Sequence, residues 1–160
     1  MNLTSLLRRS LVILALGLLA SGCDTHRNAY ALTSTGQIVK FSTTEPTAID
    51  NSVNVSGLDT GESLVQLAFR PATSAYYGVT SDNRVGTVDP ETGAVSIIST
   101  TPFTTDNLSS VAIAFDPVND QLRVTANSTA SSTTRENLRV DPDDGSLLNR
   151  STDLFYETGP

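Results

Sequence analysis

The chain has 160 residues, a formal net charge of −7 at pH 7, one cysteine and one histidine. This length suits one modest domain with its own core. An acidic surface repels phosphate groups, which argues against binding to nucleic acid. A single cysteine excludes an intrachain disulfide, so packing and hydrogen bonds must hold the fold together.

The first 22 residues have the pattern of a secretory signal peptide. Arg8 and Arg9 precede an apolar run at 11–20, and two small residues then lead to Cys23. As a helix this run is about 15 Å long, half of the roughly 30 Å core of a bilayer, which is too short for a stable transmembrane span. We therefore predict that the protein is exported.

The segment 19–23 (LASGC) resembles the bacterial lipobox, in which the cysteine is acylated and becomes the first residue of the mature protein. Ala20 stands where the lipobox usually has leucine. The resemblance implies a signal peptide at 1–22, lipidation of Cys23 and a lipidated tether at 23–28. It also implies a protein of the bacterial cell envelope, anchored to a membrane and facing the periplasm or the exterior. Ordinary cleavage that leaves a free thiol is the alternative.

Removal of residues 1–22 takes away two arginines and lowers the formal charge to −9. Charge then gives no attraction to anionic lipid, so the acyl chains on Cys23 must provide the membrane contact. The only histidine, His26, lies in the predicted tether. With its thiol acylated and its imidazole in a tether, the chain lacks the partners for Ser-His-Asp or Cys-His catalysis and for a Cys/His zinc site.

Residues 29–160 are predicted to form a β domain, because short apolar runs alternate with Gly, Pro, Asn and Asp and no helical period is sustained. This region also repeats itself: Tyr30 begins a motif that returns 47 residues later at Tyr77. An insertion at 128–136 lengthens the last interval. The matching segments are 30–42 with 77–89, 67–71 with 113–117, and 88–93 with 140–145.

A period of this length with four short strands is typical of propeller blades. The expected fold class is therefore all-β, with β-propeller-like four-stranded blades, about three of them, forming an incomplete propeller. Unrelated hairpins in a β-sandwich are the alternative. The expected strands are 64–69, 75–80, 84–88 and 94–99 for one blade, with 110–115 opening the next blade and 29–55 supplying the previous one.

One turn repeats together with its chemistry. In the segment 89–93 (DPETG), the Asp89 carboxylate is expected to accept backbone N–H groups as an Asx turn, Pro90 presets φ, and Gly93 supplies a positive φ. The segment 141–145 (DPDDG) is its counterpart in the next predicted blade.

Four segments carry a family resemblance: 29–34 (AYALTS), 57–65 (GLDTGESLV), 67–73 (LAFRPAT) and 137–145 (NLRVDPDDG). They resemble the bacterial domain-of-unknown-function family 4394, whose members are exported proteins with propeller-like repeats. The stretch 69–73 (FRPAT) is the most specific part of the resemblance. The resemblance implies a propeller-like fold and no activity. Family domains continue past the place of Pro160, so we expect a truncated reading frame, an N-terminal fragment or a piece completed by another chain. The uncovered apolar faces of such a piece favour self-association.

Acidic residues are the remaining candidates for chemistry. Glu62, Asp116 and Asp120 lie near strand ends, where paired carboxylates can hydrolyse a substrate, but turn and surface positions explain them better. A calcium loop that begins at Asp141 fails because Gly145 falls on position 5 of the EF-hand pattern, where a ligand is required. No catalytic, cofactor-binding or metal-binding residue is therefore assigned.

The aromatic residues invite a second interpretation, in which they stack on a saccharide. Tyr30 and Tyr77 share one repeat position, so packing between blades explains them, and with them Tyr76, better. Phe69 and Phe115 both end an apolar run before a turn, and we expect both to be buried.

The function expected from these observations is a propeller-like binding or scaffolding module of the envelope. It would bind a protein or a saccharide, would use no cofactor and would not be an enzyme. A propeller hydrolase that uses acidic residues and is incomplete in this chain is the alternative.

Overall fold

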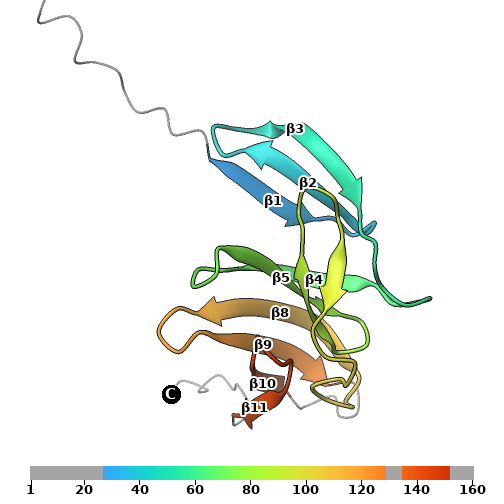
Figure 1. Cartoon of the computed structure of the whole chain (residues 1–160), viewed down its shortest axis with the longest axis vertical. Coiled ribbons are helices and arrows are strands. Elements are labelled where there is room, and N and C mark those ends of the chain that lie inside the picture. The colour runs from blue at the N-terminus through green and yellow to red at the C-terminus, as the bar shows by residue number, and fades with distance from the viewer. Residues whose placement is uncertain (1–26, 129–134, 152–160) are drawn as a thin grey trace, which may run out of the picture.

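A computed structural model describes residues 27–128 and 135–151, and every regular element within them is a β-strand (Figure 1). This confirms the all-β class that the short alternating runs predict. The strands are β1 Asn28–Leu32, β2 Gln37–Ser42, β3 Glu45–Asn54, β4 Leu64–Arg70, β5 Ala75–Thr80, β6 Val85–Val88, β7 Val95–Ile97, β8 Leu108–Asp116, β9 Gln121–Ser128, β10 Arg135–Val140 and β11 Leu147–Arg150.

The strands form three antiparallel sheets in which neighbours in sequence are neighbours in the sheet. We call them the first sheet (β1–β3), the middle sheet (β4–β7) and the last sheet (β8–β11). Figure 1 shows them in succession, from the blue and cyan first sheet through the green middle sheet to the orange last sheet. Such meanders need only short turns, which the Gly, Pro, Asn and Asp clusters supply. The described residues contain three open sheets and no closed ring.

The strand positions in the middle sheet agree closely with the prediction. β5 covers the predicted 75–80, and β4 extends the predicted 64–69 by one residue. β8 is longer at both ends than the predicted 110–115. These positions were predictable because the alternation of side chains and the residues of tight turns are local features of the sequence.

The first sheet has one strand fewer than the other two. β1, β2 and β3 match β5, β6 and β7 in register, so the described residues contain no counterpart of β4 in the first sheet. One cross-strand pair shows the match in all three sheets: Tyr30–Lys40, Tyr77–Thr87 and Arg123–Arg139.

The turn between β6 and β7 has the geometry predicted from its sequence. The Asp89 carboxylate accepts the N–H two residues later at 2.9 Å, and Gly93 has a φ of 77°. The turn between β10 and β11 repeats both features, with the same 2.9 Å contact at Asp141 and a φ of 74° at Gly145. The two segments that match in sequence therefore fold in the same way.

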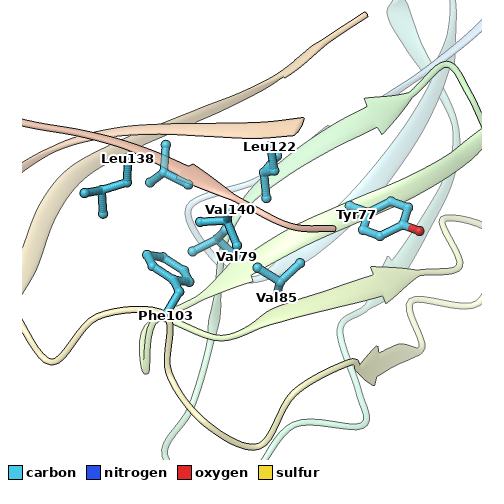
Figure 2. Close-up of a cluster of buried hydrophobic side chains, with 8 residues drawn as sticks. Tyr77, Val79, Val85, Phe103, Leu122, Leu138 and Val140 are labelled. Atoms are coloured by element: carbon cyan, nitrogen blue, oxygen red, sulfur yellow. The ribbon is translucent and has the colours of Figure 1, made fainter. Parts of the chain in front are cut away.

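The larger of two apolar clusters fills the space between the middle and last sheets (Figure 2). Most of its members alternate along their strands, so one face of each strand contributes to it. Figure 2 shows Phe103 entering from the loop between β7 and β8. The buried members are Tyr77, Val79, Val85, Phe103, Leu122, Val124, Leu138 and Val140.

The smaller cluster joins the first and middle sheets, and its buried members are Ile38, Leu64, Val88 and Val95. The linker between these sheets runs along the start of β7. The Ser56 N–H donates to the carbonyl of Gly93 at 3.0 Å, and the Val95 N–H donates to the carbonyl of Ser56 at 2.9 Å. The middle sheet is therefore covered on both of its faces.

The expected burial of Phe69 is wrong. Phe69 and Phe115 hold equivalent register positions, opposite Tyr76 and Leu122 respectively. However, the Phe69 residue is 46% exposed, whereas Phe115 packs against the larger cluster. The reason is the missing strand: Phe69 faces the first sheet at the place where no described strand lies opposite β4.

The outward faces of the first and last sheets differ in polarity. An uncovered apolar face was expected on both, and only the first sheet has one. The outward side chains of the first sheet include Ala29, Ala31, Val39, Phe41 and Ile49, of which the last is 54% exposed. The outward side chains of the last sheet are mainly polar and include Gln121, Arg123, Thr125, Asn137 and Arg139.

Candidate functional site

Contacts between arginines and carboxylates join the sheets, and the most extensive is centred on Arg70 at the end of β4. Arg70 is 4% exposed. Its Nε and Nη2 donate to Asp120 at 3.0 and 2.6 Å, and its Nη1 donates to Asp143 at 2.6 Å. Nη1 also donates to the Tyr77 hydroxyl at 2.9 Å. One side chain of the middle sheet thereby holds two turns of the last sheet.

A similar contact joins the first and middle sheets. The Lys40 Nζ donates to the Glu91 carboxylate at 2.6 Å, and the Tyr30 hydroxyl donates to the same oxygen. The hydrogen bond from Lys40, followed by that from Tyr30, lowers the pKa of Glu91. The Lys40 side chain is 23% exposed and that of Arg70 is 5% exposed, so the basic group of this contact is more hydrated than the one at Arg70.

The two contacts repeat one arrangement. Glu91 and Asp143 hold the same place in the turn between the third and fourth strands of their sheets. Each carboxylate reaches back to the preceding sheet, where it meets either Tyr30 or the Arg70–Tyr77 pair. The sheets are therefore joined at both boundaries by a carboxylate from the later sheet.

A third cluster lies beside the linker that leads into β4 of the middle sheet. Arg84 is 9% exposed and donates to Asp59 at 2.7 Å and, through Nε, to Glu62 at 2.9 Å. The hydrogen bond from Arg84 is the largest of the effects that lower the pKa of Glu62. This cluster fastens the linker before β4 to the start of β6.

A fourth cluster fixes the loop before β8. Arg150 donates to Glu136 at 2.5 Å and to Asp106 at 2.7 Å. Thr104 lies in this loop and is 8% exposed; its hydroxyl donates to Asp106 at 3.0 Å and accepts from Arg150 at 3.2 Å. The buried polar contacts of Thr104 thus help to hold this loop against β11.

The electrostatic setting of seven described acids favours their charged form. Each described acid whose pKa departs from its ordinary value departs downward, because hydrogen bonds to the carboxylate outweigh desolvation. These acids are Glu62, Asp89, Glu91, Asp106, Asp116, Asp120 and Asp144. They are suited to holding cations and N–H groups in place rather than to donating a proton at neutral pH.

The three acids singled out in the sequence have three different settings. Glu62 is held by Arg84, and Asp120 is held by Arg70. Asp116 is held mainly by its own turn, where the side chain of Asn119 and the N–H of residue 118 donate to it and lower its pKa to about 2. It also forms an ion pair with Arg139 at 3.4 Å.

The segment that begins at Asp141 forms the turn between β10 and β11, as its match to 89–93 predicted. Within residues 27–128 and 135–151, no three His, Cys, Asp or Glu side chains gather as ligands for a metal ion.

Tyr30, Tyr76 and Tyr77 pack between the sheets. The rings of Tyr30 and Tyr76 meet edge to face with centroids 5.2 Å apart, and those of Tyr77 and Phe115 meet at 5.3 Å. The Tyr77 ring is almost completely buried in the larger cluster. Packing between sheets, rather than an exposed stacking platform, describes these residues.

A cleft of about 600 Å³ opens between the turn that joins β1 and β2 and the start of β4. Its lining side chains are uncharged and include hydroxyl groups and one amide. Leu32, the last residue of the edge strand β1, also lines it. The lining residues are Leu32, Thr33, Ser34, Thr35, Gly36, Ser63, Leu64, Val65 and Gln66.

Sequence reasoning missed the arginine-centred contacts and the cleft. A signal for the first was present, because Arg70 stands between Phe69 and Pro71 in the most specific segment of the family resemblance. A lone arginine at a strand end does not show which carboxylates the fold brings to it, since its partners are 50 and 73 residues away along the chain.

Two residues singled out in the sequence, Cys23 and His26, lie outside the described residues. In the part of the chain that the structure describes, no helix is long and apolar enough to cross a membrane. Attachment through Cys23 therefore rests on the sequence pattern at 19–23.

Comparison with known proteins gives one family match. None of the curated proteins compared with the chain matches it. The model of the family described as Domain of unknown function (DUF4394) matches residues 37–160, which include ten of the eleven described strands. The chain therefore belongs to this family, as the segments shared with it had predicted.

Proposed function

We propose that this protein is an exported bacterial envelope lipoprotein whose β domain is a binding or scaffolding module. In this proposal residues 1–22 are removed, Cys23 carries the acyl chains, and residues 23–28 tether the domain at 29–160 to a membrane. The domain faces the periplasm or the exterior. The three successive sheets act as propeller-like blades, a description supported by their meander order and their face-to-face clusters.

The observation that carries the binding role is the uncharged cleft between the first and middle sheets. Its hydroxyl groups can exchange hydrogen bonds with a neutral polar ligand, and its apolar lining includes Leu32 and Leu64. The outer side of the edge strand β1 is unpaired within the described residues. These features fit a neutral saccharide or an extended polypeptide.

A hydrolase that uses acidic residues is the weaker candidate. General acid catalysis at neutral pH needs a carboxyl group whose pKa is raised. Glu62, Asp116 and Asp120 instead have lowered pKa values and serve an arginine or a turn. The cleft also contains no acidic side chain among its lining residues.

The binding role is tested by filling the cleft. We expect the full chain to bind specific members of a saccharide array or of a peptide array, and Ser34→Trp to abolish this binding. Thr73→Trp, in the exposed turn between β4 and β5, is the matched control and should leave binding unchanged. Binding that survives Ser34→Trp, or that is lost equally in both variants, would place the ligand elsewhere.

The anchor is tested separately with a radiolabelled fatty acid supplied to the expressing cells. Label should enter the wild-type protein and should be absent from Cys23→Ala. Equal labelling of the two proteins would refute lipidation at this residue and would leave the cleft experiment unaffected.

A further inference from the structure

At each boundary between sheets, a carboxylate of the following sheet binds a basic side chain of the preceding sheet that lies beside a tyrosine. Tyr30 and Lys40, paired across β1 and β2, both donate to Glu91. At the next boundary Tyr77 lies in the same place, and Arg70 beside it binds Asp143. In both cases the carboxylate comes from the turn between the third and fourth strands of the following sheet.

The last sheet carries Arg123 and Arg139 at the equivalent place. They are direct partners across β9 and β10, and both face away from the middle sheet because their neighbours along each strand belong to the larger apolar cluster. Like charges directly opposite one another destabilise a sheet. Arg123 donates through Nε to the amide of Asn137 at 2.9 Å, and Arg139 lies 3.4 Å from Asp116 and 3.5 Å from Gln121.

These neighbours neutralise the pair only in part. Arg139 forms an ion pair with Asp116, which also accepts from Asn119, whereas the partner of Arg123, Asn137, is uncharged. Among the described residues, no carboxylate from a following sheet reaches Arg123. Arg123 thus has no carboxylate partner among the described residues, and an acid that binds it has to come from elsewhere.

We propose that the outward face of the last sheet binds the outward face of the first sheet of a second copy, head to tail. In the register of the repeat, the place of Glu91 in the first sheet falls on Thr44, in the turn between β2 and β3. The next residue, Glu45, is exposed. Glu45 of the second copy would therefore approach Arg123 and Arg139 as Glu91 approaches Lys40.

The two outward faces favour this head-to-tail arrangement over a contact between like faces. Two last sheets would bring four arginines together, which charge repulsion opposes. Two first sheets would bury Phe41 and Ile49 but would leave Arg123 without a carboxylate. A head-to-tail contact gives the apolar first sheet a covering surface and the arginines an acid. Such contacts either close into a ring or extend into an open chain.

The experiment is a charge swap followed by sedimentation velocity, with every protein a full chain in the same neutral detergent. The first variant combines Arg123→Glu with Arg139→Glu, and the second carries Glu45→Arg. Each alone should associate at least about tenfold more weakly than the wild type, because each places like charges at the contact. An equimolar mixture should recover association, because both of its contacts then join opposite charges.

Asp82→Arg is the matched control, since Asp82 is exposed in the turn between β5 and β6, away from both outward faces, and this variant should associate like the wild type. Circular dichroism and thermal unfolding check that each variant is folded. Three results would overturn the proposal: both variants associate as strongly as the wild type, their mixture does not recover association, or the wild-type chain stays monomeric at low salt.

Discussion

At the scale of single residues, two bases, Arg70 and Lys40, bind carboxylates from the next sheet and so join the sheets. Arg70 is nearly buried and uses its planar fork to reach Asp120, Asp143 and Tyr77 at once. Lys40 makes the corresponding contact at the other boundary, but it is a single point charge and its side chain is 23% exposed, against 5% for Arg70. The two contacts are equivalent in position and unequal in desolvation.

This difference predicts the effect of removing each base. Arg70→Met should lower the free energy of unfolding by about 2 kcal/mol, because it leaves a buried hydroxyl and two carboxylates without their donor. Lys40→Met should have a much smaller effect, since water can replace the lost contact. Urea unfolding of both variants measures the difference, and equal losses would show that burial does not distinguish the two contacts.

The lowered pKa of Asp116 predicts how stability depends on pH. Its pKa is about 2 in the folded protein and about 3.8 in the unfolded chain. At pH values between these two, the unfolded chain binds more protons than the folded protein. The stabilising effect of the Asp116 carboxylate is therefore complete above about pH 4 and is lost as the pH falls to about 2. The melting temperature should fall through this window, and Asp116→Asn should make the fall shallower. An unchanged slope in that variant would contradict the assignment.

At the scale of elements, each repeated turn has two local features, an Asx hydrogen bond and a glycine with positive φ. The turn at 89–93 also has a close contact with a distant segment. Asp89 and Asp141 bond the backbone two residues on, and Gly93 and Gly145 take a positive φ. Both local features are readable from the sequence. The distant contact is the one between Gly93 and Asn54 at the end of β3, where an added Cβ would be 2.2 Å from a carbonyl oxygen.

A comparison of Gly93 with Gly36 separates the cost of a positive φ from the cost of the close backbone contact. Both have a φ of 77°, but nothing lies within 4 Å of a Cβ added at Gly36. Gly36→Ala should therefore cost only the strain of the positive φ, about 1 kcal/mol, whereas Gly93→Ala should cost about 2 kcal/mol more because backbone must move. Thermal unfolding of both variants measures this. Equal losses would mean that the approach of the linker to the turn adds nothing to stability.

Phe103 and Phe69 provide a second comparison at this scale. Phe103 is 5% exposed in the larger cluster, and Phe69 is 46% exposed. Phe103→Ala should cost about 3–5 kcal/mol through the cavity it leaves, and Phe69→Ala should cost about 1 kcal/mol. Chemical unfolding distinguishes the two. A larger loss for Phe69→Ala would indicate that another chain or segment covers it in solution.

At the scale of the whole molecule, the middle sheet is the best protected part of the described structure. It has an apolar cluster on each face, while nearly all of β3 in the first sheet is exposed. Amide hydrogen exchange should therefore be slowest in β5, around Tyr77 and Val79, and fast in β3. Mass spectrometry of exchanged peptides tests this order. Equal protection of the two strands would show that the first sheet is covered by another surface.

Much of the fold could be predicted from the sequence, because strand alternation, turn residues and a repeated motif are local signals. β5 and the turn at 89–93 are examples. The burial of Phe69 could not be predicted, since it depends on which strand of another sheet lies opposite. The cleft was equally hidden, because Ser34 and Ser63 become neighbours only when two sheets pack.

By itself the sequence determined the all-β class, the positions of the strands in the middle sheet, the chemistry of the repeated turns and membership of the family. Each of these depends on residues that are close together in the chain or on a motif read in order. Only the tertiary structure decided that Arg70 binds Asp120 and Asp143, that the last sheet ends in a polar face and the first in an apolar one, and that a cleft lies between two sheets. These features depend on contacts between distant segments, and such contacts are fixed by how whole sheets pack on one another.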